Sequence, residues 1–203
     1  MNNFKKILKV VGYILFFLII AVCCGKNNFI ADYFSIKQQI NASEKINNTK
    51  ELNTWYEYED KWLRTKLPNK FEKTESNSAN LKDTTIFSIS LENGVFSRIS
   101  NLNYSSPNSR SEKDILSTVI ENEVKSNNGD KLIFEYSISD SVGQIEGSYS
   151  ETEGRFKGQK VSFNGFLKKE DETKVLMLFH YALGENENTI KNLKTLVQSV
   201  QFK

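Results

Sequence analysis

Apolar and polar residues alternate along most of the chain beyond residue 54, and this period of two predicts a protein built mainly of β-strands. Pro68 ends the first of these strands, because proline cannot continue a central strand, and residues 69–81 read as a loop. Lys174–Leu183 is the most apolar strand and should lie at the centre of the sheet. The expected strands cover residues 62–67, 87–91, 95–104, 132–138, 142–150, 155–167 and 174–183.

Two stretches instead carry apolar residues at helical spacing. Ser111-Glu112-Lys113-Asp114 resembles a capping box, and an apolar stripe from Ile115 to Val124 follows it before Asn127-Asn128-Gly129. The second stripe runs from Ile190 to Val200, with Asn186 or Asn188 as its start signal. Each stretch predicts an amphipathic helix with one face on the sheet.

The Asn93-Gly94 dipeptide is typical of a type I′ hairpin turn. A two-residue turn there would pair Leu91 with Phe96 and Ile89 with Arg98, which puts a guanidinium on the apolar face. We expect a β-bulge that returns Ile99 to the core. The alternative is that Arg98 lies on this face because it has a function there.

The order of elements is strands, a helix, four consecutive strands and a final helix. This order favours an α+β fold, in which helices pack on an antiparallel β-sheet. The strand ending at Leu67-Pro68, the mid-chain helix, the four-stranded meander and the closing Ser199-Val200-Gln201-Phe202 together resemble the PsbP-like fold. This fold is named after the extrinsic protein of the photosystem II oxygen-evolving complex.

The resemblance covers about Trp55 to Lys203 and implies a small exported or accessory binding protein. It brings no catalytic motif and no site residues. The N-terminal region has no proline-rich cleavage segment of the thylakoid type, which argues against the photosystem role itself.

A run without charge extends from Val10 to Gly25, and Lys5, Lys6 and Lys9 precede it. We expect residues 1–25 to form one N-terminal transmembrane or signal helix, with the N-terminus in the cytoplasm and the remainder exported. Three fates stay open: an uncleaved anchor, which we favour, a cleaved signal peptide, and a lipoprotein signal. Ile20-Ala21-Val22-Cys23 resembles a lipobox, so Cys23 is the candidate lipidation site.

Residues 26–54 are interpreted as a partly helical stalk. Phe29, Tyr33, Ile36 and Ile40 recur at helical spacing, and polar residues follow them. A helix that lies on a surface or binds a partner is the alternative. The extracytoplasmic α+β domain then occupies residues 55–203.

The composition and the distribution of charge limit the classes of partner that the chain is expected to bind. With 203 residues, 38% hydrophobic and 26% charged, the chain suits one globular domain with an appendage. The formal net charge of +2 depends on the three lysines before the apolar run, and without them the acidic residues are in excess by one. No nucleic acid is expected as a partner, because the remaining basic residues are interleaved with acidic ones.

The exported part contains few residues of the types that catalyse reactions or bind metals. His180 is the single histidine and lies in the central strand, where a packed structural histidine is the first interpretation and a general base the second. Neither a metal nor a cofactor is expected, since histidine and cysteine ligands are too few. Acidic clusters at residues 57–60 and 170–172 are typical of solvated turns.

Trp55, Tyr56, Tyr58 and Trp62 form the densest aromatic stretch. Aromatic residues are enriched at interfaces, although a first strand must also fill its core. The candidate interaction residues are therefore Trp55, Tyr56, Tyr58 and Arg98, and no catalytic residue is proposed.

The leading hypothesis is a membrane-tethered, extracytoplasmic, non-catalytic binding or accessory domain, which presents a sheet face or edge to a protein partner in the envelope. The alternatives are a small cell-envelope hydrolase that uses His180 with neighbouring carboxylates, and a lipoprotein stress factor. The anchor and the lack of a catalytic motif favour the first.

Overall fold

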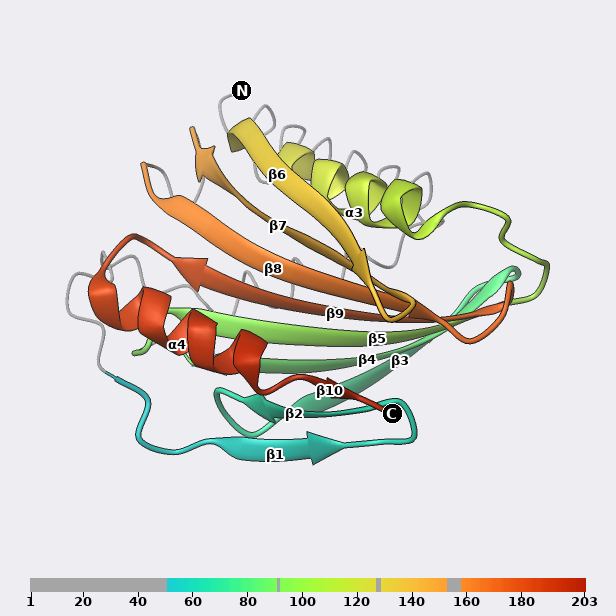
Figure 1. The fold of residues 1–203 in the computed structure, drawn as a ribbon, viewed down its shortest axis with the longest axis horizontal. Helices are drawn as coiled ribbons and strands as arrows, with labels where there is room; N and C mark the ends of the chain where they lie inside the picture. The colour runs from blue at the N-terminus through green and yellow to red at the C-terminus, as the bar shows by residue number, and fades with distance from the viewer. Residues whose placement is uncertain (1–50, 91, 127–128, 153–157) are drawn as a thin grey trace, which may run out of the picture. The chain divides into compact units, whose positions relative to one another are not determined.

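A computed structural model describes residues 51–90, 92–126, 129–152 and 158–203, all of which belong to one compact unit, residues 42–203. Within them, a seven-stranded sheet has the order β3-β4-β5-β9-β8-β7-β6, and a three-stranded sheet has the order β1-β2-β10 (Figure 1). Every strand pair is antiparallel. The elements are β1 (Tyr56–Glu59), β2 (Leu63–Leu67), β3 (Glu72–Asn77), β4 (Leu81–Ser90), β5 (Val95–Tyr104), α3 (Glu112–Ser126), β6 (Gly129–Ser139), β7 (Val142–Glu151), β8 (Lys160–Lys169), β9 (Lys174–Leu183), α4 (Glu187–Gln198) and β10 (Gln201–Phe202).

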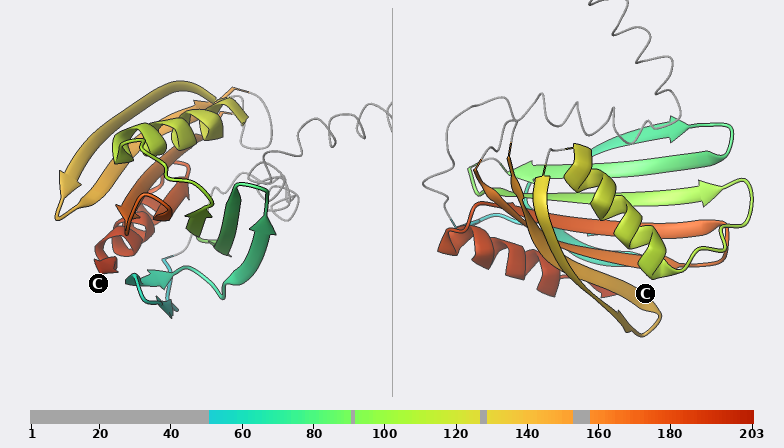
Figure 2. Two further views of the ribbon diagram at one scale, coloured as in Figure 1. Left: turned by 90° about the vertical axis from the view of Figure 1, so that its right-hand side faces the viewer. Right: turned by 90° about the horizontal axis from the view of Figure 1, so that it is seen from above.

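The architecture is the predicted α+β fold, with helices packed on a twisted antiparallel sheet (Figure 2). One face of the large sheet, the α3 face, receives α3 over β6, β7 and β8. The other face, the α4 face, is covered by α4 and by the small sheet, whose Leu63 and Leu67 pack with Ile86, Ile99 and Leu178. The large sheet is therefore the middle layer of the fold.

β9 lies at the centre of the large sheet, as its apolar sequence predicts. It is fourth of the seven strands, and its residues from Val175 to Leu183 are all buried. A strand that is covered on both faces needs apolar side chains at both odd and even positions, which is the pattern Val-Leu-Met-Leu-Phe found here.

A glycine makes room for an aromatic ladder on the α3 face. Gly165 of β8 is paired with Phe179 of β9, and a Cβ atom on Gly165 would lie 2.3 Å from the Phe179 ring. The rings of Phe179 and Tyr181 are stacked at 5.9 Å, and those of Tyr181 and Phe96 at 4.3 Å. The ladder thus ties β5 to β9, and Gly165 gives it the space it needs.

Both helix starts follow the predicted signals. The Asp114 amide donates to the Ser111 hydroxyl at 3.2 Å, and that hydroxyl donates to the Asp114 carboxylate at 2.7 Å. At α4 the cap is Asn186, whose side chain accepts a hydrogen bond from the Thr189 amide. These bonds satisfy amides that a helix start leaves without an intrahelical partner.

The predicted register of the β4–β5 hairpin is wrong. Ser90 pairs with Val95 and Phe87 with Arg98, so the turn is not a two-residue turn at Asn93-Gly94 and no bulge interrupts the paired residues. Gly94 has φ of 63°, whereas Asn93 is not among the residues with positive φ, which excludes a type I′ turn. Arg98 consequently stays on the α3 face beside Phe87, and Ile99 reaches the core on the α4 face.

Positive φ at two successive residues occurs instead at Asp140 (49°) and Ser141 (64°), between β6 and β7. Asp tolerates this region better than most residues, because its short side chain can hydrogen-bond locally. The two-residue hairpin of this fold is thus built on Asp-Ser.

Three strands were not predicted, β1, β3 and the two-residue β10. Residues 69–81 are not only a loop, since they contain β3, and β1 precedes the strand that was expected to be first. β3 pairs with β4 through its backbone and is polar throughout (Glu72-Lys73-Thr74-Glu75-Ser76-Asn77). Its sequence therefore lacks the alternation of apolar and polar residues that would indicate a strand.

The expected membrane helix, residues 1–25, and the stalk to residue 50 lie outside the described residues. Among the helices that the structure does describe, none is both long and apolar enough to cross a bilayer.

We expect Gly165→Ala to lower the free energy of unfolding by about 1–3 kcal/mol, because the added methyl group must displace the buried Phe179 ring. Urea unfolding followed by tryptophan fluorescence measures the change. Ser137→Ala, at an exposed position of β6, is the control and should change stability by less than about 0.5 kcal/mol. Equal stability of the two variants would show that the ring adapts to the methyl group without cost.

Candidate functional site

The turn between β1 and β2 forms one wall of a groove against the large sheet. Asp60 organises this turn: its Oδ1 accepts from the amides of Trp62 at 2.7 Å and Leu63 at 2.9 Å, and its Oδ2 accepts from the Tyr58 hydroxyl at 2.8 Å. Burial, the hydrogen bond to Asp60 and its negative charge together raise the pKa of Tyr58 above its ordinary value. Tyr58 therefore stays protonated and fixes the turn.

The groove has a volume of about 350 Å³ and lies between the small sheet and the α4 face of β3, β4 and β5. Its lining combines apolar side chains, aromatic rings and polar groups. The lining residues are Tyr58, Asp60, Lys61, Trp62, Lys73, Thr84, Ile86, Asn101, Leu102, Asn103 and Val175.

Asn101 is the most informative residue of the groove. Its Oδ1 is buried, and it finds no hydrogen-bond donor among the described residues. A buried carbonyl oxygen without a donor costs about 1–3 kcal/mol, so such groups in folded proteins are usually satisfied by water or a ligand. Asn101 also lines the groove, so a rotation of its side chain would present this acceptor there.

The structure separates the four predicted interaction residues. Tyr58 is 8% exposed and meets the Phe71 ring edge-on at 5.7 Å. Tyr56 packs against the same apolar cluster, whereas Trp55 packs on the cluster that contains Leu196 of α4. Of the four, only Tyr58 lines the groove.

Arg98 lies on the α3 face, away from the groove. It is 6% exposed, and its guanidinium carbon is 5.9 Å from the centre of the Phe87 ring. A buried guanidinium beside an aromatic ring is a packed structural cation, held in part by the ring quadrupole. It does not share a surface with Trp55, Tyr56 and Tyr58.

Cys23, the candidate lipidation site, lies outside the described residues. In the part of the chain that is described, no three His, Cys, Asp or Glu side chains are placed to hold a metal ion. The acidic turn at residues 170–172 is used structurally: Asp171 accepts from the hydroxyl and the amide of Thr173, which lowers the pKa of Asp171.

His180 is fully buried and cannot contact a substrate in this conformation. Its Nδ1 lies 2.7 Å from the Ser97 hydroxyl, and its Nε2 has no hydrogen-bond partner among the described residues. Desolvation lowers the pKa of His180 from 6.5 to about 3. A general base needs contact with the proton that it removes, so this geometry favours the packed structural histidine.

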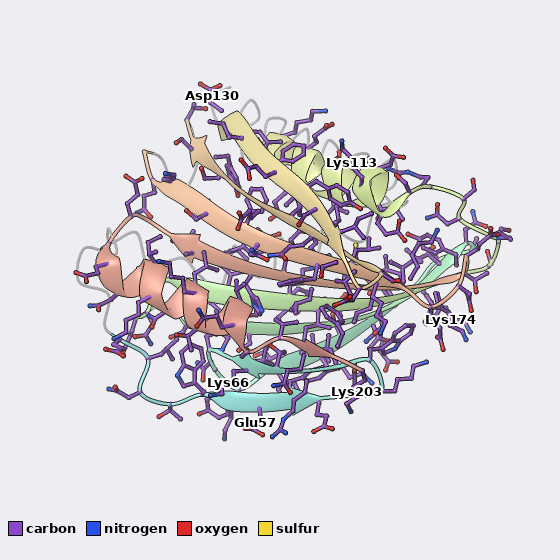
Figure 3. All side chains as sticks on the ribbon, in the orientation of Figure 1. Glu57, Lys66, Lys113, Asp130, Lys174 and Lys203 are labelled. Carbon is purple, nitrogen blue, oxygen red and sulfur yellow. The ribbon has the colours of Figure 1, made fainter. Side chains whose placement is uncertain are left out.

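A second groove, of about 380 Å³, borders the small sheet and the end of α4, where Glu57 and Lys66 lie on neighbouring strands (Figure 3). Two of its charges are already paired with each other: Arg64 donates to Glu57 at 2.7 Å, and it also lies 3.9 Å from Glu59. Exposed ion pairs of this kind contribute little free energy, and among the described residues that line this groove no side chain has a buried polar atom without a partner. The groove beside Trp62 is the better candidate.

Sequence analysis missed most of the groove, because its walls come from strands far apart in the chain. Asn101 and Asn103 are the signal that was available, since two amides at alternate positions interrupt the apolar face of a buried strand. Lys73 and Thr84 carried no such signal, because β3 itself was not recognised.

No protein-family model matches the chain, and no curated protein sequence matches it either. Among solved structures, the solution structure of cyanobacterial PsbP (CyanoP) from Synechocystis sp. PCC 6803 is similar, with a TM-score of 0.47 and 14% sequence identity. The similarity covers 74% of this chain and 93% of that chain. The PsbP-like fold suggested by the order of elements is thus also found by structure comparison, and the similarity concerns the fold alone.

We expect the free energy of unfolding to fall as the pH decreases from about 6.5 to about 4.5, by up to about 1.4 kcal/mol per pH unit. The pKa of His180 is lowered on folding, so the unfolded chain takes up a proton in this range and the folded chain does not. Glu59, Glu75 and Asp171, whose pKa values are also lowered on folding, contribute mainly below this window.

Urea unfolding at several pH values measures this slope, with His180→Gln as the comparison. The variant should be less stable at neutral pH and should lose most of the slope between pH 6.5 and 4.5. An unchanged slope in the variant would assign the effect to other groups.

Proposed function

We propose that this chain is a membrane-tethered, extracytoplasmic, non-catalytic domain that binds a segment of a protein partner in the groove between its two sheets. The observation that carries the proposal is Asn101, which lines the groove and whose buried Oδ1 has no hydrogen-bond donor among the described residues. A polypeptide segment supplies what this site needs, an N–H donor beside an apolar side chain.

The walls explain how such a segment would be held. Ile86 provides apolar surface, and Trp62 provides an aromatic side chain with Lys61 Nζ 4.5 Å from the ring centre. Tryptophan residues in partly buried positions are frequent anchors of protein interfaces. Lys61 and Lys73 give the rim positive charge, which Glu170 and Glu75 partly balance.

The tether is proposed from the sequence. Lys5, Lys6 and Lys9 before the charge-free run favour a cytoplasmic N-terminus and an exported domain. An uncleaved span and a lipid on Cys23 both leave the domain at the membrane surface, and we favour the span. The hydrolase alternative has lost its main support, because His180 is buried, and no observation favours the stress-factor alternative.

The intact mass of the protein recovered from membranes tests the tether. We expect the full-length chain of 23.3 kDa, which keeps the apolar run. A chain that begins at a lipid-modified Cys23 would replace the span by a lipid anchor. A chain that starts beyond Gly25 without lipid would contradict tethering altogether.

A photoreactive residue in the groove tests the binding site. With the probe at Asn103, which lines the groove, we expect covalent adducts with one protein in intact membranes, and Asn101→Leu should reduce them about tenfold by removing the acceptor. A probe at Glu121, exposed on α3, is the control and should give no such adduct. Adducts that Asn101→Leu leaves unchanged would count against the groove.

A further inference from the structure

The two edges of the large sheet differ in chemistry. β3 forms one edge, and its residues are charged or polar, which is how proteins usually protect an edge from pairing with another strand. β6 forms the other edge and carries Ile133 and Ile138, which are 69% and 63% exposed (Figure 1). Among the described residues, Phe71 is the third large hydrophobic side chain that is exposed.

The β6 backbone is also suited to pairing. The strand pairs with β7, and in the described part of the chain it has no neighbour on its other side. A register shift interrupts the ladder only between Asp130 and Ile133, so residues 133–139 form a regular seven-residue stretch. An edge of this length presents a row of N–H and C=O groups to a further strand.

Charge is scarce along this stretch, which reads Ile133-Phe134-Glu135-Tyr136-Ser137-Ile138-Ser139. Glu135 is its one charged residue. The acidic Asp130, which Figure 3 labels, lies at the start of β6, beyond the register shift. The usual protection of an edge is therefore reduced to a single carboxylate.

We propose that β6 pairs antiparallel with β6 of a second copy of this chain, around a twofold axis at Tyr136. Such an axis preserves the two faces of the sheet, so residues whose numbers sum to 272 are directly opposite. Phe134 then faces Ile138 of the second copy, Ile133 faces Ser139, and Glu135 faces Ser137. Aromatic and β-branched pairs of this kind stabilise neighbouring strands.

Glu135 selects this register over its nearest competitor. An axis at Glu135 would place the two Glu135 carboxylates directly opposite each other, and opposed like charges destabilise a sheet. An axis one residue further along, at Tyr136, separates the two carboxylates and pairs Phe134 with Ile138 of the second copy. A second copy suits this edge, because the twofold axis repeats the contact between Phe134 and Ile138 and keeps the two Glu135 carboxylates apart.

Disulfide crosslinking tests the register. In the full-length chain with Cys23→Ser and Cys24→Ser, Ile133→Cys is mixed with Ser139→Cys in mild detergent. Residues directly opposite have Cβ atoms about 4.5–5.5 Å apart, close to disulfide geometry, so the mixture should give a crosslinked dimer on mild oxidation. Each variant alone should not, because its two copies of the cysteine lie several residues apart along the edge.

A crosslink from either variant alone would overturn the register, and no crosslink in the mixture would overturn the pairing. Capture of a different protein by Ile133→Cys in membranes, without the dimer, would assign the edge to another partner and overturn the proposal.

Sedimentation equilibrium of the full-length chain in detergent tests the role of the exposed side chains. Ile138→Lys should weaken self-association about tenfold or more, because the change acts twice in a twofold dimer. Phe71→Lys is the matched control, since it also removes an exposed hydrophobic side chain but lies beside β3, and it should leave association unchanged. Equal effects of the two variants, or a wild-type chain that does not associate, would overturn the proposal.

Discussion

The burial of β9 on both faces is the constraint on which this fold depends. A strand that is buried at every position from Val175 to Leu183, and apolar at nearly all of them, cannot leave either face to water. α4 and the small sheet cover one face of the large sheet, and α3 packs on the other face over β6, β7 and β8. The groove lies on the α4 side, where Asn101 and Asn103 border the turn between β1 and β2.

Two buried polar groups give the central strands a unique alignment. Ser97 pairs with His180, and the next residue along β5, Arg98, pairs with Phe179. A shift by one residue between β5 and β9 would break the contact between Ser97 and His180 and move Arg98 to the opposite face. Apolar side chains alone discriminate less between registers, because many pairings bury similar areas.

Local signals in the sequence were sufficient for the helices and for the central strand. Ser111 and Asn186 act through hydrogen bonds within three residues, and the composition of β9 reports its own burial. The β4–β5 register was not accessible in this way, since Asn93-Gly94 does not form the type I′ turn that this dipeptide usually forms. The groove was inaccessible for a similar reason: it exists only after a polar strand, β3, and a distant turn have packed together.

The small sheet joins segments from opposite ends of the described chain, because β10 pairs with β2 and the Lys203 amide donates to the Trp62 carbonyl at 2.9 Å (Figure 1). Lys203 Nζ also donates to Glu59 at 2.8 Å. The wall of the groove is thus held in place by a residue that comes after the whole large sheet in the sequence. During synthesis, the seven-stranded sheet can therefore assemble while the groove is still open on one side, and contacts of such long sequence separation form slowly. Competence to bind in the groove would consequently be acquired only after β10 and Lys203 have been made and have paired with the small sheet.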